Sequence, residues 1–448
     1  MTPIQIALIA VLALLSALWW AADTLFPQPF GYFPFRTVFM QYSGALAIGV
    51  MSVAMVLATR PVWLEKPLGG LDKMYRLHKW LGITALGVSL THWWMAQGTK
   101  WMVGWGWLTR PERRPRPPGP ADAPFTLEAA FGSLRGVAEG VGEWAFYAAA
   151  VLIVLALVKR FPYHLFARTH TLIAMAYLGL VFHSVVLVKV AYWGQPIGVV
   201  LAVLMASGSV AAVLALSGRI GAHRRVAGRV STIQDYAALD VLETRVLLGP
   251  GWPGHAAGQF AFVTSDQREG AHPYTIASAW EPAQPGITFV TKALGDHTRR
   301  LRERLHPGMQ VTVEGPYGRF TFDDGPGPQV WVGAGIGITP FIARMKHLAT
   351  QPGHGQQIDL FHPTAVYDET AIAKLRADAA AAGVRLHVRV DARDGRLDGA
   401  RLRAAVPAWQ QASVWFCGPS AFGRSLRQDL VAHDLPRARF HQELFEMR

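Results

Sequence analysis

Two apolar segments of the chain each begin and end with a histidine, and they decide how its N-terminal half folds. The segments read HKWLGITALGVSLTH (residues 78–92) and HTLIAMAYLGLVFH (residues 170–183). An α-helix rises ~1.5 Å per residue, so the two histidines of each segment stand ~20 Å apart along the helix axis. If both helices run in the same direction, His78 can face His170, and His92 can face His183. Two stacked pairs of imidazoles result, and each pair can hold one metal ion between its rings.

These pairs fit two b-type haems, each with its iron held by one histidine from either helix. A histidine inside a membrane can instead bond helix to helix or relay protons, and that reading is preferred for a single histidine. Four histidines that match in height favour the haems, with outer-sphere electron transfer as the remaining chemistry. Thirteen residues at ~100° each leave His170 and His183 ~140° apart in rotation. The second segment is therefore expected to bend, tilt or overwind, with Gly179 as the candidate position.

The apolar runs predict six helical membrane spans, because a bilayer core of ~30 Å needs about 20 apolar residues. The spans cover about residues 3–22, 40–58, 78–97, 142–158, 168–190 and 196–216. The first run could be a cleaved signal peptide. It lacks a basic start and is long for such a segment, so a retained span is expected.

The chain has 448 residues and a net charge of +13, with basic residues gathered beside the spans. They follow spans two, four and six, which the positive-inside rule places in the cytoplasm together with the N-terminus. The loop of about residues 98–141 is also basic, yet parity places it outside. We follow parity, because the C-terminal half must reach the cytoplasmic nucleotide pool. An integral protein of the plasma or inner membrane, surrounded by lipid bilayer, is expected, and the charge pattern argues against nucleic acid as a partner.

The C-terminal half has the pattern of a soluble protein. Short β-prone runs alternate with turns from Gly228, which predicts a small antiparallel β-barrel. From about Gln329, strands and helices alternate, as in a doubly wound α/β domain with a mostly parallel sheet. The expected domains are a transmembrane di-haem domain at 1–218, a β-barrel domain at 225–326 and an α/β nucleotide-binding domain at 327–448.

Two sequence motifs in this half suit phosphate binding. Gly333, Gly335 and Gly337 follow a strand, and Thr339-Pro340 open a helix, so the backbone of this loop can approach a nucleotide phosphate. The motif Gly295-Asp296-His297-Thr298 opens a basic helical stretch, whose N-terminal N–H groups and dipole favour a phosphate. Either motif alone is compatible with an ordinary turn.

The histidine spacing and the six spans resemble the ferric reductase and NADPH oxidase superfamily, and the run from His272 to Ser278 resembles the flavin-binding strand of the ferredoxin–NADP reductase superfamily. The resemblance implies that His78 and His170 ligate an inner haem, and His92 and His183 an outer haem. It implies binding of FAD and NAD(P)H by a set of C-terminal residues. They are His272, Pro273, Tyr274, Thr275, Gly295, Asp296, Thr298, Gly333, Gly335, Gly337, Thr339, Pro340, Cys417, Gly418 and Pro419.

The resemblance also implies three residues at the reacting flavin. Thr275 bonds near the reactive nitrogen, Cys417 lies beside the nicotinamide, and an aromatic near the C-terminus covers the flavin. Here that aromatic is Phe445, although Met447 and Arg448 extend the chain beyond it. Cys417 is the single cysteine, which excludes an intramolecular disulfide, and a buried thiol is equally compatible with an inert core role.

The expected function is transfer of electrons from cytoplasmic NAD(P)H through FAD and two haems to an acceptor outside. Ferric chelate, O₂ reduced to superoxide, and an extracytoplasmic partner protein remain as acceptors. A haem-binding membrane sensor without turnover is the alternative from another class. The choice between NADH and NADPH stays open, because the run after the second nucleotide-domain strand, His362 to Ala365, is neither acidic nor strongly basic.

Overall fold

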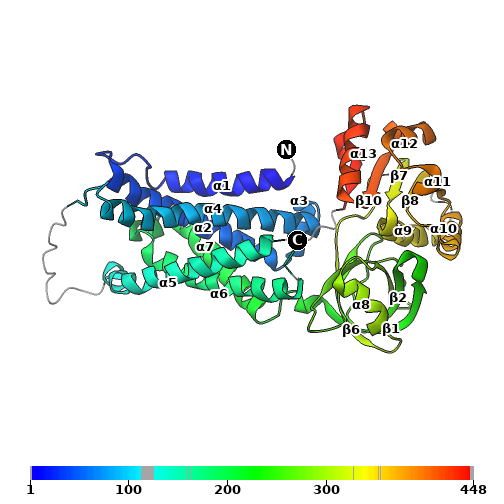
Figure 1. The fold of residues 1–448 in the computed structure, drawn as a ribbon, viewed down its shortest axis with the longest axis horizontal. Coiled ribbons are helices and arrows are strands. Elements are labelled where there is room, and N and C mark those ends of the chain that lie inside the picture. Colours follow the sequence, from blue (N-terminus) through cyan, green and yellow to red (C-terminus); the bar gives the residue numbers. More distant parts are fainter. Residues whose placement is uncertain are drawn as a thin grey trace. The chain divides into compact units, whose positions relative to one another are not determined.

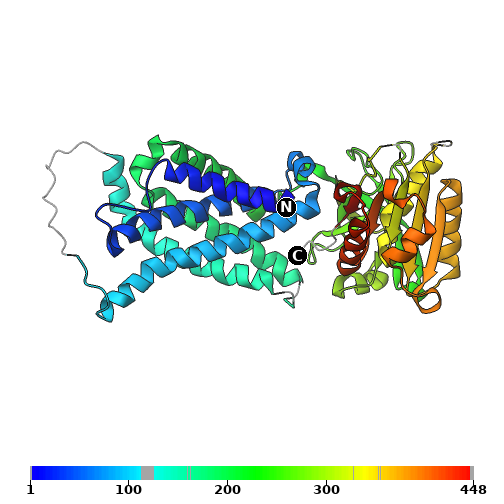
Figure 2. The same ribbon diagram turned by 90° about the horizontal axis from the view of Figure 1, so that it is seen from above.

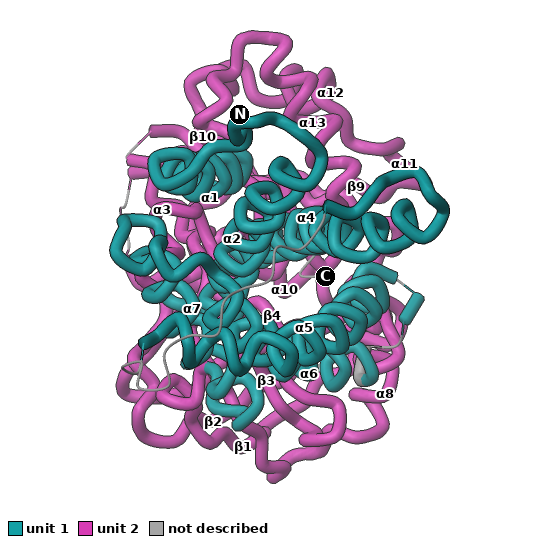
Figure 3. The backbone as a smooth tube through the Cα atoms, turned by 90° about the vertical axis from the view of Figure 1, so that its left-hand side faces the viewer, with its two compact units in different colours: residues 1–61, 74–220, 448 teal, residues 62–73, 221–447 magenta. Residues whose placement is uncertain are grey.

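The computed structural model describes residues 3–111, 126–158, 160–161, 163–325, 327–351, 353 and 355–443. The chain forms two compact units, coloured separately in Figure 3. The first contains the residues up to 61 and residues 74–220, and the second contains residues 62–73 and the residues from 221 on. The segment 62–73 lies in the sequence between two predicted spans, yet it packs with the C-terminal half.

Among the described residues, six long helices build the first unit and lie side by side in Figures 1 and 2. They are α1 (Pro3–Trp20), α2 (Tyr32–Ala58), α4 (Leu71–Gly104), α5 (Leu127–Leu157), α6 (Tyr163–Leu187) and α7 (Pro196–Leu216). A shorter turn of helix in this unit is η2 (Val190–Gly194), whereas η1 (Val62–Leu64) and α3 (Glu65–Leu68) belong to the second unit. Each predicted span falls largely within one of the long helices, so the predicted positions of the helices along the chain agree with the structure.

The helix ends differ from the predicted ones for local reasons. Helix α5 begins about four turns before the predicted fourth span, because Thr126 caps it by accepting a hydrogen bond from Ala129 N at 3.2 Å. Pro196 occupies the first turn of α7, where backbone N–H groups have no partner within the helix, so the N–H that proline lacks is not needed. Within the described residues, five helices are long and apolar enough to cross a membrane, and α4 is not among them. Polar residues such as His78 and Lys79 dilute its apolar run.

The N-terminal part of the second unit is an antiparallel sheet in the order β4-β3-β6-β1-β2-β5. Its strands are β1 (Arg225–Tyr236), β2 (Val241–Leu248), β3 (Phe260–Thr264), β4 (His272–Thr275), β5 (Gly286–Lys292) and β6 (Gln310–Tyr317). A bridge between Ile276 and Phe289 joins the two edge strands, so the sheet closes into the expected barrel. The helices of this part are η3 (Ala222–Arg224), η4 (Ala237–Leu239) and α8 (Asp296–Arg304).

The C-terminal part of the second unit is a parallel sheet in the order β11-β10-β7-β8-β9. The strands are β7 (Gln329–Gly333), β8 (Ile358–Thr364), β9 (Arg385–Val390), β10 (Ser413–Cys417) and β11 (Phe440–Gln442). The helices are η5 (Gly335–Ile338), α9 (Thr339–Ala349), α10 (Glu369–Ala381), α11 (Asp391–Asp394), α12 (Gly399–Ala405), η6 (Trp409–Gln411), α13 (Ser420–Ala432) and η7 (Arg437–Arg439).

Two apolar clusters show that helices cover both faces of this sheet. One cluster joins Trp331 and Leu360 to Phe341 of α9 and Leu375 of α10. The other joins strand residues to α12 and α13, with Val332 among its members. The strand order reverses between β10 and β7, and such a switch point is where doubly wound domains bind ligands. The expected α/β fold is confirmed.

Candidate functional site

The four histidines of the first unit meet in the two pairs that their spacing predicts. The ring centres of His78 and His170 lie 5.8 Å apart, and those of His92 and His183 lie 6.5 Å apart. Two imidazoles that share one metal have ring centres roughly 6 Å apart, because each metal–nitrogen bond is about 2 Å. Both pairs therefore have the separation that one bound metal requires.

Hydrogen bonds fix which nitrogen faces the partner ring in three of the four histidines. Nδ1 of His78 donates to Ala54 O at 2.9 Å, and Nδ1 of His183 donates to Ala138 O at 2.8 Å. Nδ1 of His92 lies 3.0 Å from Ser43 Oγ, whose own proton goes to a backbone carbonyl of α2 at 2.7 Å. Nδ1 of His92 is therefore the donor. A donating Nδ1 leaves Nε2 with its lone pair, as in histidines that ligate metals.

The fourth histidine lacks such a partner among the described residues. Nδ1 of His170 is buried and makes no hydrogen bond there, and its ring stacks on Phe166 with centres 5.0 Å apart. Helix α6 is continuous through Gly179, which packs close to Ala145 of α5. One unbroken helix thus brings both of its histidines to their partners.

His92 and His183 line a cavity of about 370 Å³. A Cβ added to Gly142 would overlap the ring of His183, whereas one added to Gly44 would be in ordinary contact with His92. Arg36 also lines this cavity, and its Nε donates to Met95 O at 2.8 Å. Other basic and acidic side chains of the lining are Lys100, Arg135, Glu139 and Glu143. This lining fits a haem. The two imidazoles can hold its iron, the glycine at 142 leaves space for one of the rings, and the cationic side chains can pair with its acidic substituents.

The second unit contains a larger cavity of about 990 Å³, of the size that a cofactor needs. The barrel contributes Pro273, Tyr274 and Thr275 from β4, and Thr298 from α8. The α/β part contributes residues that follow the carboxyl ends of its strands. These are Gly335, Ile336, Gly337, Thr339, Thr364, Ala365, Val366, Asp391, Arg396, Gly418 and Pro419. The cavity thus unites the predicted flavin strand with the predicted nucleotide loop.

The glycines of the nucleotide loop have separate structural causes. Gly335 has a φ of +54°, which a residue with a side chain adopts at a cost. A Cβ at Gly337 would overlap the backbone of Cys417. Ala334 N donates to Cys417 O at 2.9 Å, so the loop after β7 is tied to the end of β10. Because these glycines carry no side chain, the backbone N–H groups of the loop can approach a phosphate closely.

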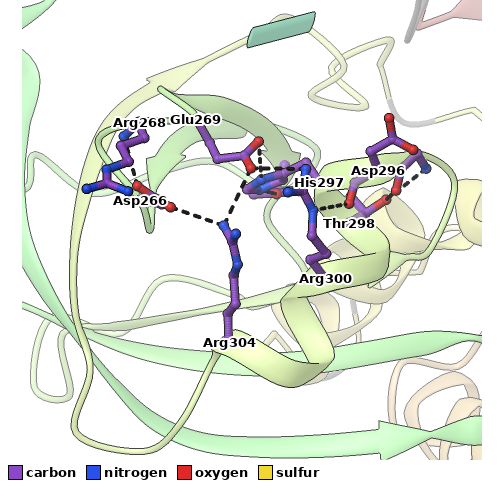
Figure 4. A network of polar contacts seen from close by, with 10 residues as sticks. Asp266, Arg268, Glu269, Asp296, His297, Thr298, Arg300 and Arg304 are labelled. Atoms are coloured by element: carbon purple, nitrogen blue, oxygen red, sulfur yellow. Dashed lines mark hydrogen bonds and ion pairs between the residues drawn. The ribbon is translucent and has the colours of Figure 1, made fainter. Parts of the chain in front are cut away.

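A polar network surrounds His297 at the start of α8 (Figure 4), and it also contacts Tyr274 of the predicted flavin strand. Nε2 of His297 lies 3.0 Å from the Tyr274 hydroxyl, and its Nδ1 lies 3.4 Å from a Glu269 carboxylate oxygen. His272 stacks on His297 with ring centres 3.6 Å apart. Burial, and then the neighbouring His297, lowers the pKa of His272 to about 4, and burial chiefly lowers the pKa of His297. Both rings are therefore neutral at physiological pH.

Helix α8 starts where the sequence predicted a phosphate site. The Thr298 hydroxyl accepts hydrogen bonds from Leu294 N and Gly295 N, both at 3.0 Å, and so fixes the first turn. The arginines that follow are partly neutralised, since Arg300 lies 3.1 Å from Glu269 and Arg304 lies 3.0 Å from Asp266. The helix N-terminus is therefore a stronger candidate for phosphate than these arginines.

Not every predicted residue lines the large cavity. Gly418 and Pro419 do, whereas six others are not part of the lining: His272, Gly295, Asp296, Gly333, Pro340 and Cys417. Cys417 is fully buried, and burial raises the pKa of its thiol, so the thiol stays protonated. Glu443 is also buried, and burial followed by the nearby Asp72 raises its pKa to about 8. Phe445 lies outside the described residues.

Two features of the second unit escaped the sequence patterns. Asp391 and Arg396 follow β9 and line the large cavity. The Glu65 carboxylate accepts a hydrogen bond from Gly318 N at 3.1 Å, which attaches the segment 62–73 to the barrel. The position of Asp391 and Arg396 on the cavity and the contact of Glu65 with Gly318 depend on which segments of the chain pack together. A local sequence motif does not contain this information.

Comparison with known proteins gives a match in each half of the chain. Residues 43–181 match the ferric reductase like transmembrane component, and residues 232–321 match an FAD-binding domain. An NADPH oxidoreductase of Mycobacterium tuberculosis is 30% identical over 190 residues, which are 39% of this chain and 49% of that protein. The ferredoxin–NAD(+) reductase component of the alkene monooxygenase system of Xanthobacter autotrophicus is 29% identical over 210 residues, covering 42% of this chain and 63% of that protein.

Among solved structures, the flavohemoglobin of Malassezia yamatoensis with bound FAD and heme is 19% identical with a TM-score of 0.47. The match covers 71% of this chain and 91% of that one. The chain spans less than two thirds of the length of the curated relatives it matches. The two family matches occur in the order of the two halves, one on the helical unit that carries the histidines and one on the barrel. The two halves of the chain are therefore similar to a ferric reductase like transmembrane component and to an FAD-binding domain, a combination that matches the ferric reductase and NADPH oxidase superfamily.

Proposed function

We propose that this protein transfers electrons from cytoplasmic NAD(P)H, through FAD and two b-type haems, to an acceptor on the outer side of the membrane. The observation that carries the proposal is the separation within both histidine pairs, 5.8 Å and 6.5 Å, with donating Nδ1 atoms behind three of the rings. His78 and His170 would hold the inner haem, and His92 and His183 the outer one. Bound haem supplies one-electron transfer, and bound FAD accepts hydride and releases single electrons.

In the second unit, the chain orients the two other groups of the reaction. Tyr274, held by His297, offers an aromatic face for the flavin ring, and the Thr275 hydroxyl lies next to it on the same strand. Gly335 and Gly337 receive the phosphates of NAD(P)H, with Gly418 and Pro419 beside the nicotinamide. Cys417 supports this turn from behind as a neutral thiol. Phe445 is proposed to cover the flavin.

Six spans with a cytoplasmic N-terminus are part of the proposal. The segment 62–73, which connects spans two and three, belongs to the same compact unit as the barrel. A connection that packs with the flavin domain must be on the side of that domain, which agrees with its positive charge. The histidine pair His92–His183 then lies towards the outside, and the loop at about 98–141 lies there too.

Ferric chelate and O₂ are the proposed acceptors, and a partner protein outside is the alternative. Cationic residues around the outer cavity, Arg36 and Lys100 among them, favour an anionic ligand or substituent there. The other candidate function, a haem-binding sensor without turnover, requires no intact cavity between the flavin strand and the glycine loop. The cavity of about 990 Å³ favours turnover instead.

The test is anaerobic reduction of the purified full-length protein, loaded with FAD and haem, by NADH or NADPH. Haem absorbance should shift to the reduced form, and air-saturated buffer or ferric citrate, added separately, should reverse the shift. His78→Ala should lose the reduction of the inner haem, while His223→Ala, an exposed histidine of η3, should behave as wild type.

Each outcome decides between the candidates. Haems that neither coenzyme reduces would refute electron transfer and leave the sensor. Fast reoxidation by O₂ with superoxide formed would identify an oxidase, and reoxidation by the chelate alone a metalloreductase. Slow reoxidation by both would point to a partner protein.

A further inference from the structure

The large cavity of the second unit has a charged wall that the proposed function does not use. Asp391 is the first residue after β9, and Arg396 follows it within the same connection. Both line the cavity together with the glycine loop. The preceding strand β8 ends in Thr364, and Ala365 and Val366 follow it, so the wall carries no charge there.

The strand order places Asp391 on the far side of the glycine loop from the nicotinamide turn. In the sheet, β7 stands between β10 on one side and β8, then β9, on the other. Neighbouring strands lie about 4.8 Å apart, so the end of β9 is ~10 Å from the end of β7. Pro419 follows β10 and lies on the opposite side. A dinucleotide with its phosphates at Gly335–Gly337 and its nicotinamide towards Pro419 therefore directs its adenosine ribose towards Asp391.

The arginines around Asp391 are bound by other groups. Nε and Nη2 of Arg393 lie 3.1 Å and 3.2 Å from the Asp394 carboxylate. Arg389 donates to Asp394 O, and Arg401 donates to Arg396 O. Each of these contacts holds a guanidinium on the β9 connection itself. They leave Arg396 as the arginine of the cavity wall, and its side chain is partly exposed to solvent.

We propose that Asp391 selects NADH over NADPH, an inference that rests on the proposed use of this cavity for a nicotinamide coenzyme. A carboxylate at this place accepts hydrogen bonds from the ribose hydroxyls of NADH, and it repels the additional 2′-phosphate of NADPH. Arg396 compensates poorly, because it is exposed whereas Asp391 is half-buried, so water and salt screen the attraction of the arginine more than the repulsion of the aspartate. Asp391 thus excludes NADPH by charge.

The experiment compares the wild-type full-length holoprotein with Asp391→Asn and, as a matched control, Glu369→Gln. Glu369 is an exposed acid in the first turn of α10, so its substitution removes one negative charge from the same part of the sheet without touching the cavity wall. Coenzyme oxidation is followed with ferricyanide as the acceptor. Separately, calorimetry measures the binding of 5′-AMP and of 2′,5′-ADP, which carry the adenosine end without nicotinamide.

Wild-type protein should show kcat/KM at least about tenfold higher for NADH, and it should bind 5′-AMP more tightly than 2′,5′-ADP. Asp391→Asn should raise kcat/KM for NADPH about tenfold, while Glu369→Gln should change the ratio less than about twofold. A wild-type preference for NADPH, or an unchanged ratio in Asp391→Asn, would overturn the assignment. Failure of both coenzymes to reduce ferricyanide would refute the proposed function, and the binding of the two fragments would still decide the role of Asp391.

Discussion

Replacement of Glu443 by glutamine should abolish the loss of stability that this carboxyl causes in the second unit between pH 5 and pH 8. Glu443 is 5% exposed, and one of its carboxyl oxygens makes no hydrogen bond within the described residues. Burial and the neighbouring Asp72 raise its pKa to about 8, against an ordinary value of 4.5. The neutral acid is therefore the form that the folded protein accommodates.

The direction of the pH effect follows from this raised pKa. A group whose pKa is higher in the folded state contributes stability at low pH and loses it as the pH rises to the folded value. Each pKa unit corresponds to about 1.4 kcal/mol, so the loss between pH 5 and pH 8 is up to about 4 kcal/mol. For a unit of this size, 1 kcal/mol shifts Tm by about 2–4 °C, and the Tm difference between variant and wild type should then grow by on the order of 10 °C.

The assay is thermal unfolding of the full-length protein in detergent, followed by flavin fluorescence at pH 5, 6, 7 and 8. Wild type and Glu443→Gln should unfold at similar temperatures at pH 5, and the variant should be the more stable one at pH 8. Glu303→Gln, an exposed acid of α8, is the control and should follow wild type. Parallel curves for wild type and Glu443→Gln would show that this carboxyl is already ionised in the folded protein, and the reasoning from its burial would be wrong.

Three further predictions concern the proposed haem ligands and the 62–73 segment. His78→Ala should reduce the haem content measured as pyridine haemochrome from about two per chain to about one, since ligation of the iron by two histidines needs both rings; two haems in the variant would contradict the assignment. Gly142→Ala should displace His183 and lower haem content, whereas Gly140→Ala, which faces open space on the same helix, should not; equal content in the two variants would exclude the steric argument. Glu65→Ala should lower Tm by a few degrees, because the lost hydrogen bond from Gly318 N leaves a buried donor unpaired at a cost of about 1–3 kcal/mol; an unchanged Tm would show that the contact is dispensable.

The positions of the helices and strands could largely be predicted from the sequence, because they depend on local patterns. Apolar runs of bilayer length predicted the six helices, although α4 is not among the five described helices that are long and apolar enough to cross a membrane. Alternation of strands and helices predicted the α/β part, and in the structure Asp368 caps α10 by accepting a hydrogen bond from Ala371 N. The pairing of His78 with His170 also followed from the sequence, since the rise of a helix is fixed.

The partners of these elements were decided by the tertiary structure. The groups that orient three of the paired histidines lie on other helices, and two of them act through backbone carbonyls that every residue carries. These groups belong to Ser43, Ala54 and Ala138. The attachment of Glu65 to Gly318 joins positions 253 residues apart.

Asp391 shows the same division between local pattern and tertiary contact. The sequence directed attention to the residues after β8, because the common dinucleotide pattern has its charged residue there. The strand order places the end of β9 on the cavity as well, and only folding brings that aspartate to the coenzyme site. Sequence alone determined the elements and the residue types of the proposed metal-binding and flavin-binding side chains, since these depend on neighbours along the chain. The tertiary structure decided which side chains meet across the chain, since such contacts depend on how the elements pack.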